Sequence, residues 1–251
     1  MQLAANAFAA ERALVRLSPM SILQEISVPK ELQRNDPKVL EAGVEETGEI
    51  LLVNLARRIG RPDLGGLDLL DVGCGVRFTQ TLINRSLAFN SYTGIEVYLP
   101  IVQWLKDNVE GKDERFHFVH WNVHNAMYNK KAPPMSACEA LPVEDSYDLI
   151  MGFSLFTHLA PDDASQMLKL TRKVVRPEGF LFFSAFCSES LETFEDRVPG
   201  KPLLNAYYNP SYLKRLLKVE GWKTISYAQP GAYIASSFLC GPSGLPVLEK
   251  N

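Results

Sequence analysis

The sequence predicts an α/β fold built on a seven-stranded, mostly parallel sheet with helices on both faces. Two patterns support this prediction. Short apolar runs alternate with stretches of helical period, and only a few residues separate the last two extended runs. Alternating strands and helices imply right-handed parallel crossovers and a sheet covered on both faces. An antiparallel pair is expected only at the C-terminal end.

The first helix of the main body is expected to begin at Asp36–Pro37, where an N-cap residue precedes a proline suited to the first turn. It is expected to reach about Ile59 and to end at Gly60. One stripe of this helix should face the core; it holds Val39, Leu40, Val44, Thr47, Leu51 and Leu55. Residues 36–251 would form the main domain.

Residues 1–35 are expected to form a separate N-terminal helical appendage, broken by Pro19 and Pro29. Leu3 to Leu17 has the period of an amphipathic helix. Its apolar stripe suits packing against the body of the protein or a second copy of the chain better than binding to a membrane. We expect the appendage to act as a lid over the ligand site or as a subunit contact.

The other elements follow in order along the chain. Strands are expected near residues 67–72, 92–97, 116–121, 147–153 and 179–186, and helices near 77–88, 99–109, 161–176 and 210–220. Extended runs at 222–228 and 233–239 flank Gln229-Pro230-Gly231-Ala232, a connection so short that it requires a hairpin. Irregular insertions at 125–146 and 187–209 would lie beside the carboxyl edge of the sheet, where ligands bind.

The composition is that of an ordinary globular protein, with 46% hydrophobic and 22% charged residues and a net charge of −3. The sequence contains no block of five like charges, so it gives no indication of a surface that binds nucleic acid. No apolar run is long enough to span a bilayer, so stable membrane insertion is not expected. The four cysteines are scattered, which fits the reducing cytoplasm better than a disulfide framework.

The most informative segment is Leu67-Asp68-Leu69-Leu70-Asp71-Val72-Gly73-Cys74-Gly75, a buried strand that ends in an acid and a glycine turn. A second strand ends in Glu96, about 25 residues after Asp71. Glycines let backbone N–H groups approach a ligand closely, and an acid at the tip of the next strand can accept ribose hydroxyls. Together they predict a nucleoside-containing cofactor across the ends of two parallel strands.

These motifs resemble the class I S-adenosylmethionine-dependent methyltransferases. The resemblance covers about residues 38–240 and rests on Leu-Asp-Val-Gly-Cys-Gly at 70–75, Gly-Ile-Glu-Val at 94–97, Tyr-Asp-Leu-Ile at 147–150, Phe-Ser-Leu-Phe-Thr-His-Leu at 153–159 and Val-Arg-Pro-Glu-Gly-Phe-Leu at 175–181. The segment from His117 to Asn129 is similar to a bacterial subgroup with small substrates. The resemblance implies a Rossmann-like fold and S-adenosyl-L-methionine as the cofactor.

It also implies roles for particular residues. Gly73, Cys74 and Gly75 would pass under the methionine portion of the cofactor, with Asp71 near its ammonium group. Glu96 would accept the ribose hydroxyls, and Val97 would pack against the adenine. Val123 and Phe153 are the remaining cofactor-binding candidates.

The chain departs from the family pattern at Asn122 and Arg77. The family usually has an aspartate at the first position, which accepts from the adenine amino group. Asparagine can still accept through its carbonyl oxygen, although without charge assistance, or it is a simple turn residue. Arg77 replaces a small residue. It would tighten the cofactor pocket, offer a cation to a carboxylate of cofactor or substrate, or lie exposed in the first turn of a helix.

The histidines fall into two groups. His117, His120 and His124 do not predict a metal site, because His117 and His120 face opposite sides of a strand and no acid or cysteine supports them. His158 follows the fourth strand, where the transferred methyl group is expected. It is the catalytic candidate as a general base, and the alternatives are a helix cap or part of the pocket wall.

The expected activity is methyl transfer to a hydroxyl or amine of a small molecule, either a metabolite, a sugar or a lipid-linked acceptor. The alternatives are a non-catalytic cofactor-binding or scaffold protein and, less favoured, a nicotinamide-dependent oxidoreductase. Two observations count against the oxidoreductase: the glycine turn lacks the final glycine of a dinucleotide-binding motif, and no catalytic Tyr-x-x-x-Lys pattern occurs. Nucleic acid is not expected as the acceptor, since Gly152-Phe153-Ser154-Leu155 stands where an Asn-Pro-Pro-Tyr motif would follow strand four.

Overall fold

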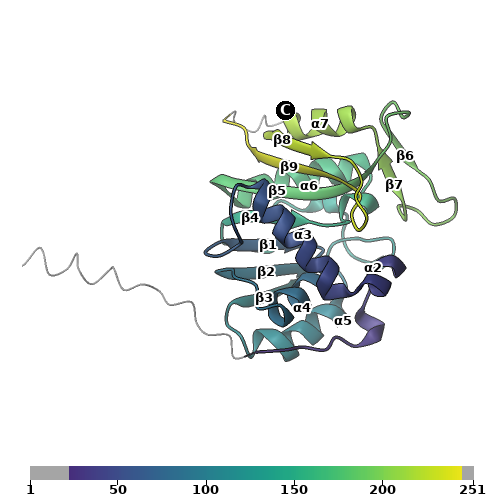
Figure 1. Ribbon diagram of the computed structural model, residues 1–251. Helices are drawn as coiled ribbons and strands as arrows, with labels where there is room; N and C mark the ends of the chain where they lie inside the picture. The colour runs from purple at the N-terminus through teal and green to yellow at the C-terminus, as the bar shows by residue number, and fades with distance from the viewer. Residues whose placement is uncertain (1–22, 245–251) are drawn as a thin grey trace, which may run out of the picture.

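The computed structural model describes residues 23–244, which form a mixed sheet between two layers of helices (Figure 1). Seven strands build the main sheet, in the spatial order β3 (Phe116–His120), β2 (Ser91–Glu96), β1 (Asp68–Val72), β4 (Tyr147–Gly152), β5 (Val175–Cys187), β9 (Ser236–Pro242) and β8 (Trp222–Ala228). The first five strands pair in parallel, and β9 pairs antiparallel to β5 and β8. The predicted fold class is therefore confirmed.

The C-terminal hairpin has the predicted antiparallel pairing but a longer connection. β9 begins at Ser236, so residues 229–235 join the two strands, with a turn in which Gly231 N–H donates to the carbonyl of Ile234 at 2.9 Å. Leu181 of β5 pairs with Cys240, which places β9 between β5 and β8. The spacing of apolar residues, which suggested a start at 233, did not locate the start of β9.

Two short strands were not predicted. β6 (Phe194–Asp196) and β7 (Ala206–Tyr208) form a small antiparallel hairpin within the 187–209 insertion, and β7 pairs with the end of β5 through Phe186 and Cys187. The hairpin therefore extends the sheet at its carboxyl edge. Strands of three residues are too short to show a sequence period, which is why the segment reads as irregular.

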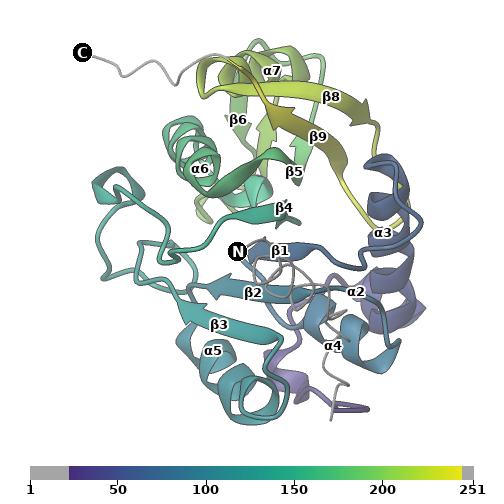
Figure 2. The ribbon, with the colours of Figure 1, turned by 90° about the vertical axis from the view of Figure 1, so that its left-hand side faces the viewer.

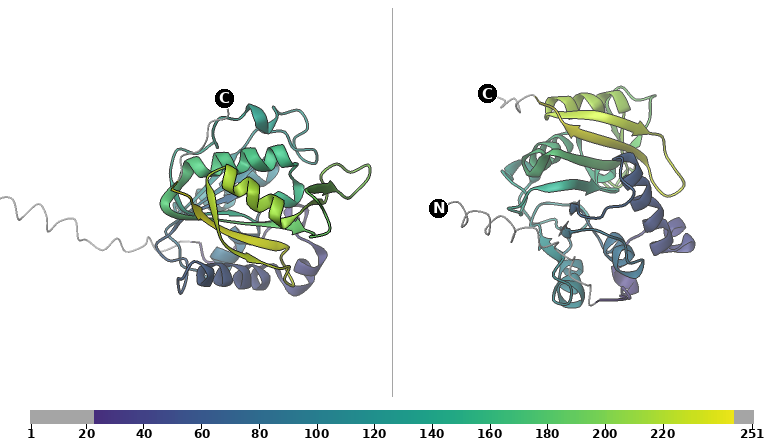
Figure 3. Two further views of the ribbon diagram at one scale, coloured as in Figure 1. Left: turned by 90° about the horizontal axis from the view of Figure 1, so that it is seen from above. Right: turned by 60° about the vertical axis from the view of Figure 1, so that its left-hand side comes forward.

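Each face of the sheet carries its own apolar core. The first core combines side chains of α3 (Val44–Arg58), α4 (Arg77–Asn84) and α5 (Leu99–Leu105), which continues as a π-helical turn over Lys106–Glu110. The second combines α6 (Pro161–Val174) and α7 (Pro210–Val219). Neighbouring residues Leu69 and Leu70 of β1 belong to different cores because side chains alternate along a strand. Figures 2 and 3 show α6 on the opposite side of the sheet from α3.

The predicted helix at 36–59 is two helices, α2 (Pro37–Ala42) and α3. Gly43 interrupts them with φ 93° and ψ 127°, a left-handed backbone conformation that glycine adopts without steric cost. Leu40 is 44% exposed and does not lie on the buried stripe, so this part of the prediction was wrong. The predicted ends were correct: Asp36 caps Lys38 N–H at 2.9 Å, and Gly60 has φ 76°.

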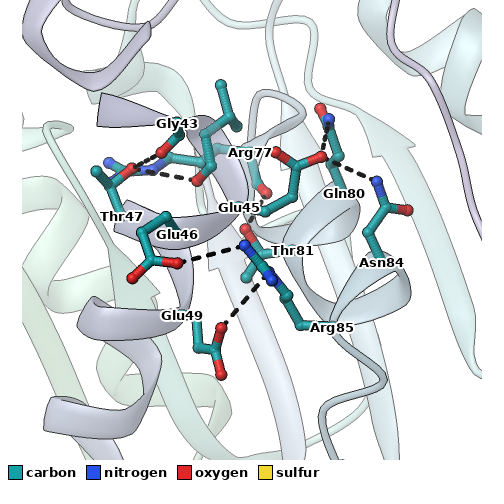
Figure 4. Close-up of polar contacts among 11 residues, drawn as sticks. Gly43, Glu45, Glu46, Thr47, Glu49, Arg77, Gln80, Thr81, Asn84 and Arg85 are labelled. Atoms are coloured by element: carbon teal, nitrogen blue, oxygen red, sulfur yellow. Dashed lines mark hydrogen bonds and ion pairs between the residues drawn. The ribbon is translucent and has the colours of Figure 1, made fainter. Parts of the chain in front are cut away.

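Polar contacts fix α3 on α4 (Figure 4). The carboxylate of Glu45 accepts from Gln80 Nε2 at 2.6 Å and from Asn84 Nδ2 at 3.0 Å. Arg85 pairs with Glu46 at 3.4 Å and with Glu49 at 3.5 Å. These contacts hold the middle and the C-terminal end of α4 against α3.

Residues 23–36 cross the α4 side of the molecule as a strap, which is extended apart from a 3₁₀ turn at Lys30–Leu32. Ile26, Val28 and Leu32 are buried in the first core, and Asn84 bonds both the N–H (2.8 Å) and the carbonyl (2.9 Å) of Ile26. This part of the appendage therefore packs into the same core as the sheet. The expected helix from Leu3 to Leu17 lies outside the described residues. None of the helices between residues 23 and 244 is long and apolar enough to cross a membrane.

Candidate cofactor and acceptor site

A cavity of about 300 Å³ lies at the carboxyl ends of the central strands. Of the residues that the sequence predicts for the site, its lining includes Asp71, Gly73, Cys74, Gly75, Glu96, Val97, Val123, Phe153 and His158. These residues lie at or shortly after the ends of β1, β2, β3 and β4. The cavity therefore joins the cofactor motifs to the candidate base in one continuous space.

The turn after β1 has the backbone that its glycines predict. Gly73 has φ 74° and Gly75 has φ 50°, values that L-residues rarely adopt. Gly73 N–H and Cys74 N–H both donate to the carbonyl of Ile95, at 2.8 and 3.1 Å, so the turn is tied to the end of β2. A Cβ on Gly75 would meet no atom within 4 Å, which leaves open space beside this backbone.

Glu96 ends β2 with a carboxylate that is already hydrogen-bonded. Oε1 accepts from Val97 N–H at 2.8 Å and Tyr98 N–H at 2.9 Å, and Oε2 accepts from Gly75 N–H at 3.1 Å. The residue is 8% exposed, and these three backbone donors offset the cost of burying its charge. A carboxylate oxygen can accept more than one hydrogen bond, so Oε2, which accepts only from Gly75, keeps acceptor capacity for a ligand hydroxyl.

Asp71 is almost fully buried, and its Oδ2 accepts from the hydroxyl of Tyr92 at 2.7 Å. Burial raises the pKa of this carboxyl to about 7, with a further contribution from the charge of Glu96 and an opposing one from the Tyr92 bond. A cation placed in the cavity would favour the ionised form. Tyr92 is a contact that the sequence did not reveal, because it lies on the neighbouring strand.

Asn122 and Val123 differ in placement. Val123 is 1% exposed and lines the cavity. Asn122 is exposed, its Oδ1 accepts from Asn129 Nδ2 at 3.1 Å, and it is not part of the lining. Contact between Asn122 and an adenine amino group would require this side chain to turn, and that role stays a prediction.

His158 ends a 3₁₀ turn, Phe156–His158, and is half-buried. Its Nδ1 lies 3.0 Å from the carbonyl oxygen of Leu203, which can only accept, so Nδ1 carries the proton and Nε2 keeps a lone pair. Burial lowers the pKa of His158 below its ordinary 6.5, against a smaller opposing effect of the Leu203 and Leu204 backbone. The imidazole is therefore neutral at pH 7.

The other histidines make separate contacts. Nδ1 of His117, 64% exposed, lies 2.9 Å from Glu110, and Nε2 of His120 lies 3.2 Å from the carbonyl of Val97. His124 lines the cavity. Residues 23–244 contain no group of three or more His, Cys, Asp or Glu side chains arranged to hold a metal ion.

The strap supplies a wall of the cavity. The sequence suggests residues 1–35 as a lid or a subunit contact, but it singles out none of the lining residues of this segment. Leu32, Arg34 and Asn35 line the cavity, and the Arg34 guanidinium stacks between the rings of Tyr98 (3.7 Å) and Tyr128 (3.9 Å). Such cation–π contacts join three segments far apart in the chain. No local signal in the sequence could have found them. The stack encloses the cavity next to Val97.

Residues 26–227 match the family model described as "Methyltransferase domain", and the chain belongs to this family. Its resemblance to class I S-adenosylmethionine-dependent methyltransferases is thereby confirmed, as is the prediction of an enzyme with S-adenosylmethionine as its cofactor. The family match begins within the strap, ten residues before the domain boundary at 36 that the sequence suggests.

Solved structures share the fold at low sequence identity. A 1,6-didemethyltoxoflavin-N1-methyltransferase from Burkholderia thailandensis has a TM-score of 0.56 and 17% identity, over 81% of this chain and 80% of its own. A magnesium protoporphyrin IX methyltransferase from Synechocystis has a TM-score of 0.54 and 13% identity, over 95% and 92%. An S-adenosylmethionine-dependent methyltransferase from Clostridium acetobutylicum has a TM-score of 0.57 and 11% identity, over 82% of this chain and 96% of its own.

Proposed function

We propose that this methyltransferase transfers the methyl group of S-adenosylmethionine to a hydroxyl or amine of a small molecule. The observation that carries the proposal is the single cavity shared by the Gly73–Gly75 turn, Glu96 and His158. Cofactor and acceptor must meet in one enclosed space for in-line displacement, and the cavity provides that space.

The polar groups of the cavity fit the parts of this cofactor. Glu96 retains acceptor capacity for ribose hydroxyls, Val97 offers an apolar contact for the adenine, and Asp71 is a buried carboxyl suited to the ammonium group. When bound, S-adenosylmethionine supplies an already activated methyl group. The protein's part is then to align the two reactants, exclude water and accept a proton from the acceptor.

His158 has the properties of a proton acceptor beside the reacting groups. It lines the cavity, its Nδ1 proton is committed to Leu203, and its neutral form leaves Nε2 available. Pro202 and Leu203, from the loop between β6 and β7, line the same cavity. The unpredicted hairpin would therefore present one wall of the acceptor site.

The size and chemistry of the cavity favour a small acceptor. Apolar side chains such as Met135, Leu155 and Leu203 line much of the enclosed space, and the chain has a net charge of −3. Both features argue against a nucleic-acid strand. Similar folds include a glycopeptide N-methyltransferase and a 1,6-didemethyltoxoflavin-N1-methyltransferase, which is in keeping with such an acceptor. All four cysteines are free thiols, in keeping with a cytoplasmic protein.

Two measurements test the proposal. Calorimetric titration with S-adenosylhomocysteine should show saturable binding, whereas NAD should give none. Incubation with methyl-labelled S-adenosylmethionine and fractionated small-molecule extract should then label a low-molecular-weight product. Binding without labelling in any fraction would instead support a non-catalytic cofactor-binding protein, and binding of NAD alone would refute methyl transfer.

A further inference from the structure

Arg77 occupies an unusual position for a charged residue. It is the first residue of α4, directly after the glycine turn, and it lines the cavity. The side chain is half-buried, so the expectation of an exposed first-turn arginine is not met.

The guanidinium of Arg77 lacks a protein partner. Its Nε and Nη2 are buried and make no hydrogen bond, and no acid among residues 23–244 lies within ion-pair distance of it. The contact that it does make is weak, with its Cζ 5.6 Å from the ring centre of Phe78. Burial lowers the pKa of Arg77 to about 10, yet the group stays charged at pH 7. A buried, unpaired cation is costly, and a bound anion would offset that cost.

A second unpartnered donor lines the same cavity. Asn35 Nδ2, on the strap, is buried without a hydrogen bond. The other buried polar atoms without partners belong to Thr79, Gln80 and Ser243, which are not part of the lining. The unpartnered buried atoms of the described lining are therefore all N–H donors. Buried donors without acceptors are uncommon, and together these indicate a ligand that presents an anionic acceptor.

We propose that Arg77, assisted by Asn35, binds the α-carboxylate of the methionine portion of the cofactor. This inference rests on the proposed function. An amino-acid group carries an ammonium and a carboxylate on one carbon, and Asp71, at the other end of the glycine turn from Arg77, suits the ammonium. An acid and a cation on one short turn would recognise the zwitterion as a whole. Arginine suits a carboxylate because its planar fork donates two parallel hydrogen bonds.

The test compares two ligands that differ in the amino-acid group. S-adenosylhomocysteine carries the carboxylate, and 5′-methylthioadenosine keeps the nucleoside and sulfur but has neither carboxylate nor ammonium. Calorimetry on the full chain should show that Arg77→Gln weakens binding of the first by roughly 10- to 100-fold, the effect of a lost charged hydrogen bond. Binding of the second should be unchanged, and Arg77→Lys should recover part of the loss.

Arg85→Gln is the matched control, since Arg85 is the C-cap residue of the same helix but pairs with Glu46 and Glu49 on the surface. It should bind both ligands as the wild type does. Equal weakening of both ligands by Arg77→Gln would overturn the inference in favour of a structural role. Unchanged affinity for S-adenosylhomocysteine with a raised acceptor KM would overturn it in favour of an anionic acceptor. Failure of the wild type to bind either ligand would instead remove the proposed function itself.

Discussion

Leu203 holds its carbonyl oxygen 3.0 Å from Nδ1 of His158, across 45 residues of chain, and does so from a left-handed backbone conformation with φ 57°. A non-glycine residue rarely adopts this conformation, and such strain persists only where the surroundings impose it. The bond fixes the tautomer of His158. It also couples the loop of the β6–β7 hairpin to the candidate base.

If His158 is the general base, His158→Ala should lower turnover by roughly 10²–10⁴-fold and leave the affinity for S-adenosylhomocysteine unchanged. Because burial lowers the pKa of His158, its proton-accepting form persists below pH 6.5. The acidic limb of the wild-type kcat/KM profile should therefore lie below pH 6.5 and disappear in the variant. His158→Gln with full activity and an unaltered profile would show that the residue only shapes the pocket.

The Glu96→Ala variant should lose about 1.5–3 kcal/mol of binding free energy for S-adenosylhomocysteine, the range for hydrogen bonds to a charged group. It should also unfold at a lower temperature, because Gly75, Val97 and Tyr98 lose the acceptor of their N–H groups. Calorimetry and thermal denaturation check the two effects. Compared with Glu96→Ala, the Glu96→Gln variant should recover more of the lost thermal stability than of the lost affinity. Affinity within a factor of two of wild type in both variants would rule out the ribose role.

Binding of the cofactor product should depend on pH through Asp71. Its pKa of about 7 means that it is largely protonated at pH 6, whereas an ammonium group favours the ionised form. Affinity for S-adenosylhomocysteine should therefore rise between pH 6 and 8, and Asp71→Asn should remove that rise. A wild-type affinity that does not change over this range would contradict contact with the ammonium.

The same residue affects the stability of the free protein with the opposite trend. The pKa of Asp71 is raised above its ordinary 3.8, so the folded state holds the proton more tightly than the unfolded state does. Its contribution to the free energy of unfolding is complete below pH 3.8 and is lost as pH rises to about 7. Thermal denaturation of wild type and Asp71→Asn between pH 4 and 8 should show a difference that changes over this window.

The contact between α3 and α4 should not tolerate a methyl group at Gly48. A Cβ there would collide with the Thr81 hydroxyl and lie 3.0 Å from the Thr81 Cβ. Alanine ordinarily favours a helix interior by up to about 1 kcal/mol, but overpacking costs about 1–3 kcal/mol. Gly48→Ala should therefore destabilise the fold in denaturant titration. Adding Thr81→Ala should recover part of the loss; equal losses in the single and double variants would show that the hydroxyl is not the obstacle.

The sequence by itself determined the layered fold and the cofactor edge of the site. The spacing of apolar residues located all seven strands of the main sheet, although not the start of the last one. The glycines and acids at 71–75 and 96 identified the turn and the strand tip that line the cavity. These features are local. The backbone conformation at Gly73 and Gly75, and the choice of which strand residues are buried, both depend on residues only a few positions apart in the sequence.

Only the tertiary structure decided which distant groups meet. It packed the strap into the core, stacked Arg34 between Tyr98 and Tyr128, and left Arg77 without a partner. It also brought Leu203 to His158 and the N–H of Gly75 to Glu96. Such contacts arise when elements far apart in the chain close around one cavity. Burial of apolar side chains drives this closure, and the spacing of apolar residues in the sequence specifies which face of a helix or strand is buried. The packing of whole helices and strands then decides which polar groups become neighbours.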